Sequence, residues 1–300
     1  MSLLAAWLLG CGAGDASHTS SAPKPADPPA LPTRPTLPPK PVDEAQLRSQ
    51  CDHGQLGDCV ALGDQLRERK APEQPDYSGA VEQYDRACSA KVLLGCSQLG
   101  LMYQDGLGVP ADGARARDLY TRACEGGTAR ACSRLGGMFL TGTGVTQSFE
   151  QAQARSEAGC NGGDGLGCLN LALMYRRGDG VKRDPEHGYQ LARKSCDANE
   201  ARGCTMAGEM TTVGEGTSSN PTLGVMHAAK ACQLGDARGC GDVGVAHQLG
   251  EGAAQSPQRA AEMFARACKG GEQRYCELLN RFAADSIKAN AGKAPGAAAP

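Results

Sequence analysis

The sequence predicts an all-α solenoid of helix–turn–helix units that repeat every 36 residues and are joined by disulfide bonds. Two observations lead to this prediction: cysteines recur in pairs at a fixed period, and helix start and stop signals recur at fixed offsets from them. Composition supports it. The 300-residue chain is 40% hydrophobic, but this share includes 15 Cys and only one Trp, seven Tyr and four Phe. So few large apolar side chains favour many thin, repeated cores with covalent links over one thick core.

The cysteine spacing sets the repeat. Fourteen of the 15 cysteines form pairs eight positions apart, and from Cys88 onward the pairs recur every 36 residues, after a first interval of 37. A fixed period of this length is typical of a solenoid, in which each unit buries its apolar face against its neighbours. The pairs are Cys51 with Cys59, Cys88 with Cys96, Cys124 with Cys132, Cys160 with Cys168, Cys196 with Cys204, Cys232 with Cys240 and Cys268 with Cys276.

The second cysteine of each pair is predicted to open the first helix of a unit. A small residue follows four positions later, often a methionine at six and an aromatic residue at seven, so that these positions share one helical stripe. We interpret the methionine column (Met102, Met138, Met174 and Met210) as core packing and not as metal or haem ligands. A G-x-G motif then predicts a left-handed helix end and a turn. Its glycines are Gly106 and Gly108, Gly142 and Gly144, Gly178 and Gly180, Gly214 and Gly216, and Gly250 and Gly252.

The second helix of each unit begins sixteen positions after the same cysteine. A side chain suited to capping a helix N-terminus stands there in six units, because its oxygen can accept from a free backbone N–H. These residues are Asp76 (in the longer first unit), Asp112, Ser148, Asp184, Asn220 and Ser256. Proline follows directly at Pro185, Pro221 and Pro257, at the first helical position, where a missing N–H costs nothing. The helix runs to the first cysteine of the next pair.

Each cysteine pair is predicted to form a disulfide bond. Eight residues of one continuous helix would rise about 12 Å, beyond the reach of a disulfide, but glycine-rich or polar segments such as 125–131 and 161–167 break the helix between the two cysteines. Zinc binding is the competing interpretation. Structural zinc sites favour ligand spacings of two to four and often include histidine, and no histidine recurs in register with these pairs. Disulfide bonds require an oxidising compartment.

The N-terminus carries a short export signal. Residues 3–10 are mostly apolar and end in Leu8-Leu9-Gly10-Cys11, which resembles a bacterial lipoprotein signal; cleavage of such a signal leaves the cysteine as a lipidated N-terminus. Cys11 is also the one cysteine without a partner at the eight-residue spacing. We therefore predict a signal peptide over 1–10, a proline-rich disordered tether over 11–42, a solenoid over 43–284 and a disordered tail over 285–300.

The repeat resembles a known family. The pattern LG-x-MY-x2-G-x-GV…A…LY-x-RAC, seen best over Leu99–Cys124, is similar to Sel1-like repeats, which are related to the tetratricopeptide repeat. One bridge per repeat makes the chain look like the Helicobacter cysteine-rich proteins. The resemblance covers 51–284. The first unit departs from it, with Arg67–Pro75 in place of the G-x-G, and the fifth and sixth units lose the aromatic residue (Thr211, His247), which leaves the local turn geometry open.

Composition and motifs exclude several functions. A net charge of −2 without a basic block argues against nucleic-acid binding, and no apolar run is long enough to span a membrane. The cysteine-rich relatives imply a β-lactam-binding protein or weak β-lactamase as an alternative function. However, the only S-x-x-K motif of serine β-lactamases is Ser21–Lys24, inside the tether. The five histidines are scattered, so we predict no catalytic residues, no metal and no cofactor.

The function that remains is recognition. Solenoids of paired helices present a long face formed mainly by the first helix of each unit, and its outward positions vary from unit to unit here. Four of them could hold a carboxylate or a peptide main chain: Arg134, Asn170, Arg176 and Arg177. We therefore predict a monomeric, lipid-anchored protein of the bacterial cell envelope, periplasmic or on the outer membrane, that binds a protein or peptide partner and touches the membrane only through its anchor.

Overall fold

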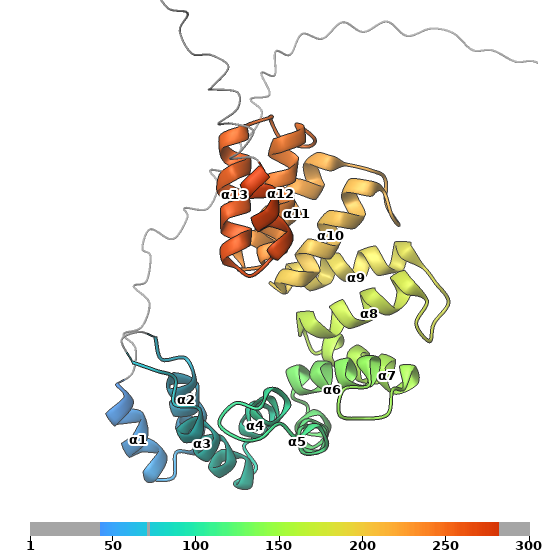
Figure 1. Cartoon of the computed structure of the whole chain (residues 1–300). Helices are drawn as coiled ribbons and strands as arrows, with labels where there is room; N and C mark the ends of the chain where they lie inside the picture. Colours follow the sequence, from blue (N-terminus) through green and yellow to red (C-terminus); the bar gives the residue numbers. More distant parts are fainter. Residues whose placement is uncertain (1–42, 71–72, 282–300) are drawn as a thin grey trace, which may run out of the picture. The chain divides into compact units, whose positions relative to one another are not determined.

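The computed structural model describes residues 43–70 and 73–281, and the regular elements in these ranges are all helices (Figure 1). The predicted signal, tether and C-terminal tail, together with Cys11, lie outside them. The helices are α1 (Glu44–Asp52), α2 (Leu56–Arg67), α3 (Tyr77–Ser89), α4 (Leu93–Asp105), α5 (Gly113–Glu125), α6 (Ala129–Thr141), α7 (Phe149–Asn161), α8 (Gly165–Arg177), α9 (Pro185–Asp197), α10 (Ala201–Val213), α11 (Pro221–Gln233), α12 (Ala237–Leu249) and α13 (Pro257–Lys269). Residues 273–281 form a further helical segment.

The helices pair as the repeat predicts. Each unit consists of an even-numbered helix followed by an odd-numbered one, and every helix packs against its neighbours in the chain. Even-numbered helices also contact one another: α2 contacts α4, α6 contacts α8, α8 contacts α10, and α10 contacts α12. These helices form the inner layer of the stack, and the odd-numbered helices form the outer layer. The predicted all-α solenoid with a period of 36 residues is confirmed. None of the described helices is long and apolar enough to cross a membrane.

All six predicted N-caps are present. In each, the side-chain oxygen accepts a hydrogen bond from the backbone N–H three residues later; Asp112 Oδ1, for example, lies 2.9 Å from the nitrogen of Arg115. The caps are Asp76, Asp112, Ser148, Asp184, Asn220 and Ser256. Because the cap and the proline after it are local signals, the start of every outer helix from α3 onward could be predicted from sequence.

The two glycines of the G-x-G motif have different roles. The first ends the inner helix in the left-handed conformation, as predicted, with φ between 68° and 86°. The second also has positive φ and lies against the preceding unit: a Cβ on Gly216 would overlap the carbonyl group of Pro185, and one on Gly252 that of Pro221. These prolines begin the outer helix of the unit before. The motif is therefore a contact between units as well as a turn, and it persists in the fifth and sixth units, whose turn geometry the sequence left open.

Seven disulfide bonds join the predicted cysteine pairs. The Cα atoms of each pair lie 4.3–4.8 Å apart, at the short end of the separations that disulfides usually span. All the bridged cysteines are buried except Cys268 and Cys276, which are partly buried. The bonds are Cys51 with Cys59, Cys88 with Cys96, Cys124 with Cys132, Cys160 with Cys168, Cys196 with Cys204, Cys232 with Cys240 and Cys268 with Cys276.

The second cysteine of a pair does not open the inner helix, and this expectation was wrong by three residues. Each inner helix begins three residues earlier, so that Cys96 lies one turn into α4, Cys168 one turn into α8 and Cys240 one turn into α12. The reason is the tightness of the preceding turn. A residue with positive φ, such as Gly163 or Gly235, reverses the chain, and a single extended residue then precedes the new helix. Each bridge therefore joins the end of one unit's outer helix to the first turn of the next unit's inner helix.

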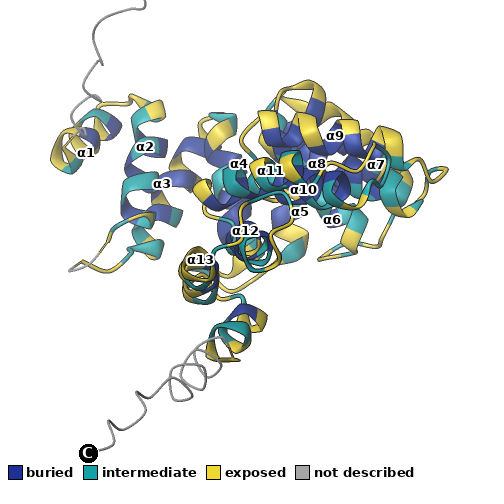
Figure 2. Ribbon diagram, turned by 90° about the horizontal axis from the view of Figure 1, so that it is seen from above, coloured by how far each residue is buried: buried dark blue, intermediate teal, exposed yellow. Residues whose placement is uncertain are grey.

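Buried residues occur in successive units (Figure 2), and within the described residues the buried apolar side chains form four clusters. Large side chains of the outer helices pack on glycines of the inner ones: a Cβ on Gly63 would overlap the ring of Tyr84, and one on Gly100 the ring of Tyr120. The four methionines of the predicted column are at most 2% exposed, which confirms their assignment to the core. His247, which replaces the aromatic residue, is partly buried, and its Nδ1 lies 2.9 Å from the carbonyl oxygen of Ala254.

Basic side chains support the unit boundaries. Two residues before the first cysteine of a pair, Arg86, Lys230 and Arg266 reach back to the preceding unit and donate to the carbonyl oxygen of its corresponding cysteine. The Lys230 contact, to the carbonyl of Cys196, is the shortest at 2.7 Å. A positive charge at the C-terminal end of a helix is favourable because the helix dipole is negative there. The five boundaries from Cys88–Cys96 to Cys232–Cys240 thus combine a disulfide bond with a glycine contact. A basic residue caps a helix C-terminus at two of them and at the boundary bridged by Cys51 and Cys59.

A central bridge should stabilise the stack across a unit boundary. Replacing Cys124 and Cys132 together by serine should lower the free energy of unfolding by about 2–3 kcal/mol, because the bridge restricts the unfolded chain. Denaturant unfolding of the oxidised protein measures this difference. Removing Cys51 and Cys59 serves as the control: it frees only the terminal helix α1, so hydrogen exchange should speed up there and not in α5 and α6. An unfolding free energy unchanged by the loss of the central bridge would contradict its role.

A second prediction separates the contact made by the second glycine from its backbone strain. Gly216→Ala combines a positive φ of 71° with an overlap at Pro185, whereas Gly235→Ala has a φ of 98° and an added Cβ there meets nothing within 4 Å. Gly235→Ala should cost about 1–2 kcal/mol from strain alone. Gly216→Ala should cost about 1–3 kcal/mol more, since the overlap adds to the strain. Equal losses of thermal stability in the two variants would show that the glycine makes no essential contact between units.

Candidate partner-binding face

The surface of the even-numbered helices, here called the inner face, carries the predicted binding residues. Arg134 lies in α6, and Asn170, Arg176 and Arg177 lie in α8. Because α8, α10 and α12 are neighbours in the inner layer, side chains at equivalent positions of these helices can reach one another across the unit boundaries.

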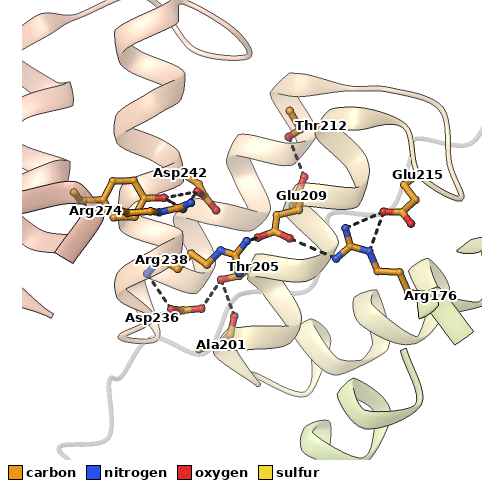
Figure 3. Close-up of polar contacts among 12 residues, drawn as sticks. Arg176, Ala201, Thr205, Glu209, Thr212, Glu215, Asp236, Arg238, Asp242 and Arg274 are labelled. Atoms are coloured by element: carbon orange, nitrogen blue, oxygen red, sulfur yellow. Dashed lines mark hydrogen bonds and ion pairs between the residues drawn. The ribbon is translucent and has the colours of Figure 1, made fainter. Parts of the chain in front are cut away.

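A ladder of ion pairs crosses these boundaries (Figure 3). Arg176 of α8 lies 3.5 Å from the Glu209 carboxylate of α10 and 2.8 Å from that of Glu215. Glu209 in turn lies 2.5 Å from Arg238 of α12. A further pair, Asp242 with Arg274 at 3.2 Å, connects α12 to the segment 273–281. The ladder therefore runs over three successive unit boundaries.

Two acidic side chains of the ladder are partly buried, and their burial raises their pKa values. The side chains of Glu209 and Asp242 are only 24% and 28% exposed. Burial raises the pKa of Glu209 above its ordinary value, although Arg238 and Arg176 act in the opposite direction. Burial likewise raises the pKa of Asp242, against a hydrogen bond from the Tyr275 hydroxyl at 2.7 Å and the charge of Arg274. The neighbouring basic groups and hydrogen bonds do not fully offset the effect of burial on these two carboxylates. A further hydrogen-bond donor would therefore stabilise their charged forms.

The ladder separates two hollows on the inner face. One, of about 570 Å³, has a polar lining that includes Arg176, Arg177, Arg202 and Glu272. The other, of about 350 Å³, lies between α10, α11 and α12 and is lined mainly by apolar residues. Arg176 and Glu209 contribute to both. A cavity with apolar walls and a few convergent polar groups is typical of a recognition site.

The structure brings two of the four predicted residues together. Arg176 and Arg177 line the polar hollow, whereas Arg134 and Asn170 lie outside it. Asn170 is 6% exposed, and its amide donates to the carbonyl oxygen of Ser133 at 2.9 Å, so it connects α8 to α6. Arg134 is partly buried beside Tyr120; burial raises the pKa of that tyrosine, and Arg134 acts in the opposite direction.

The four predicted residues do not include Arg202, Glu209 and Arg238. A signal for the arginines exists: an arginine stands two positions before the second cysteine in four units, at Arg130, Arg202, Arg238 and Arg274. In three of them it pairs with a carboxylate of a neighbouring unit, whereas no ion pair of Arg202 occurs within residues 43–70 and 73–281. Glu209 has a weaker signal, because Asp64 is the one other acidic residue at its position in the units that begin at Cys59, Cys96, Cys132, Cys168 and Cys240.

The described part of the chain holds no group of three or more histidine, cysteine or acidic side chains that could bind a metal ion. The S-x-x-K motif at Ser21–Lys24 lies outside the described residues. No observation within 43–70 and 73–281 favours β-lactam binding or hydrolysis, so that alternative stays a prediction from the resemblance alone.

The chain is similar to solved structures with the same fold. A Sel1 repeat protein from Oxalobacter formigenes is 20% identical, with a TM-score of 0.61, over 79% of this chain and 88% of the other. The protective antigen c5321 of uropathogenic Escherichia coli, which displays an SLR fold, is 22% identical, with a TM-score of 0.55, over 79% of this chain; the match spans 58% of that antigen. Helicobacter pylori cysteine rich protein B is 27% identical over 44% of this chain and 94% of its own, with a TM-score of 0.37.

No curated protein matches the sequence significantly. The family model that matches is the Sel1 repeat, over residues 93–128, 129–154, 165–200, 201–236 and 237–272. Each matched stretch begins at or beside the start of an inner helix, and four of the five end in the turn after the following outer helix. Since these stretches cover more than half of the sequence and coincide with the observed units, the chain belongs to the Sel1 repeat family.

Proposed function

We propose that this protein is a monomeric scaffold of the bacterial cell envelope that binds a protein or peptide partner on its inner face and is held to a membrane by a lipid on Cys11. Sel1 repeats generally mediate protein–protein interactions. Seven disulfide bonds support an extracytoplasmic location, because such bonds persist in oxidising compartments. The lone Cys11 after an apolar segment supports the anchor.

The polar hollow is the observation that supports partner binding most directly. Arg177 and Arg202 are both exposed and line this hollow, and neither has an ion pair among the described residues. Arg176 beside them is already neutralised by Glu209 and Glu215. The two available guanidinium groups are therefore suited to a carboxylate or to main-chain carbonyl groups of a partner, which arginine can hold with two parallel hydrogen bonds. We propose an acidic segment as the occupant of this hollow.

Reversing these two charges should abolish partner capture. Arg177→Glu with Arg202→Glu should lower the amount of partner recovered from envelope extract on the oxidised chain by at least about tenfold, since attraction becomes repulsion. Arg259→Glu with Lys269→Glu makes the same change of net charge on exposed residues of the outer helix α13 and should leave the recovery unchanged. Quantitative mass spectrometry of the captured proteins measures both. Equal recovery by the two variants would refute an inner-face site at the polar hollow.

The anchor has a separate test. Cys11→Ala should move the protein from the membrane fraction to the soluble fraction, because it removes the residue that would carry the proposed lipid. Ser17→Ala, a change of similar size nearby in the predicted tether, should leave the protein with the membranes. Immunoblots of fractionated cells provide the measurement. Membrane association that survives the loss of Cys11 would contradict lipid anchoring without affecting the proposed partner site.

A further inference from the structure

The apolar hollow lies at a position where three other units hold an aromatic ring. In these units, an aromatic residue four positions before the first cysteine packs on a glycine four positions after the preceding second cysteine: Tyr84 on Gly63, Tyr120 on Gly100 and Phe264 on Gly244. In the unit formed by α10 and α11, the corresponding residues are Gly208 and Ala228, which are both small. Both line the hollow. This unit therefore keeps the glycine surface that receives a ring but supplies no ring of its own.

The polar groups around Tyr84 show what the site is built to accept. The hydroxyl of Tyr84 donates to Asp64 Oδ1 at 2.7 Å, and Gln98 Nε2 donates to the same oxygen at 2.8 Å. Burial raises the pKa of Tyr84, and the hydrogen bond to Asp64 raises it further, so the hydroxyl stays protonated and remains a donor. The hydroxyl of Tyr120 likewise donates to an acceptor on the adjoining inner helix, in that unit the amide oxygen Oε1 of Gln104 at 3.0 Å.

The apolar hollow has a carboxylate in the place of Asp64 and a second acceptor in the place of Gln98. Glu209 lies five positions after Cys204, as Asp64 lies five after Cys59, and Asp242 occupies the position of Gln98 in the next inner helix. Both Glu209 and Asp242 line the hollow. In the unit of Phe264, which has no hydroxyl to satisfy, the residue equivalent to Asp64 is Val245. In the unit of Tyr120 that position is Leu101, and the hydroxyl is accepted by Gln104 instead. The apolar hollow therefore matches the arrangement around Tyr84, with a carboxylate five positions after the second cysteine.

The mouth of the hollow is open and apolar. Val213 and Leu249, at equivalent ends of α10 and α12, are 70% and 57% exposed and line it. Glu209, Asp242 and Glu251 contribute three carboxylates to the lining, against the single guanidinium of Arg176. The complementary occupant is therefore an apolar group that carries a hydrogen-bond donor, and an anion is disfavoured.

We propose that this hollow binds a tyrosine side chain of the partner protein, with its ring against Gly208 and the apolar walls and its hydroxyl donating to Glu209. The inference rests on the proposed function and deepens it: the partner presents a tyrosine next to the segment that the polar hollow binds. A tyrosine hydroxyl is neutral at physiological pH and can donate to Glu209 Oε1, which is buried and ion-paired with Arg238 but accepts no well-aligned hydrogen bond within the described residues. Tyrosine is also enriched at interfaces, since its ring is large and its hydroxyl polar.

Capped tripeptides test the proposal on the oxidised full chain. Acetyl-Gly-Tyr-Gly-amide, titrated at millimolar concentrations, should shift the NMR methyl signals of Val213 and Leu249. The phenylalanine analogue should bind about 5–10-fold more weakly, because it cannot donate a hydrogen bond to Glu209. The phosphotyrosine analogue should bind at least about tenfold more weakly through repulsion. Equal affinity for tyrosine and alanine peptides, or for tyrosine and phenylalanine peptides, would overturn the proposal, as would tighter binding of phosphotyrosine.

Substitutions at the mouth locate the site. Val213→Ser with Leu249→Ser should weaken binding of the tyrosine peptide at least about tenfold, since the apolar walls are lost. The NMR signals of the other residues that line the hollow measure this change in affinity. Met226→Ser is the control: Met226 is 64% exposed on α11 outside the hollow, so binding should not change. All three side chains are exposed, which leaves the fold intact. Unaltered affinity in the variant that lacks Val213 and Leu249 places the peptide elsewhere and contradicts the inference.

Filling the hollow from within gives an independent test. Ala228→Tyr restores the aromatic residue of the repeat, so the thermal midpoint should rise by a few degrees and the tyrosine peptide should no longer bind. A lowered midpoint, or undiminished peptide binding, contradicts the equivalence with Tyr84. The two proposals fail separately. A partner whose capture depends on Arg177 and Arg202 but not on Val213 and Leu249 would support the proposed function and exclude the tyrosine site.

Discussion

The structure depends on one constraint: no unit buries its apolar surface alone, so each must be held against the next. The seven disulfide bonds meet this constraint directly, because each connects the outer helix of one unit to the inner helix of the following one. The glycine contacts and the basic helix caps act at the same boundaries. A chain with few aromatic residues thereby forms a stable stack, in which stability is the sum of contributions from neighbouring units.

This arrangement leaves the inner face available for recognition. Because the bridges and the thin core hold the units together, the inner helices need not be covered by apolar contacts. They carry partly buried ion pairs, which contribute little net stability once the cost of desolvation is counted, but which set the positions of charged groups across the boundaries. On either side of the ladder lie a polar hollow with two available arginines and an apolar hollow with an available acceptor. Together they define a composite site for a partner segment.

Most of the fold could be predicted from sequence, since its determinants are local. Caps such as Asp112, left-handed glycines such as Gly106 and the eight-residue cysteine spacing act within a few residues, so each can be recognised without knowledge of the neighbours. The binding face was harder to predict. The buried Asn170 donates a hydrogen bond to Ser133, which belongs to the preceding unit. Glu209 forms ion pairs with Arg176 and Arg238, which belong to two other units. Such contacts depend on the residue present in one particular unit, whereas a repeat pattern describes only what the units share.

The connectivity of the cysteines tests the account most directly. The protein, isolated from its own compartment, should be digested without reduction and its fragments identified by mass spectrometry. Lys or Arg lies between the cysteines of five pairs, and Asp lies within the other two, 51 with 59 and 160 with 168, so that proteases specific for these residues separate every pair unless it is bridged. The account predicts seven linked fragment pairs, each joining cysteines eight positions apart and dissociating on reduction. Free thiols, bound zinc or bridges between other cysteines would contradict it.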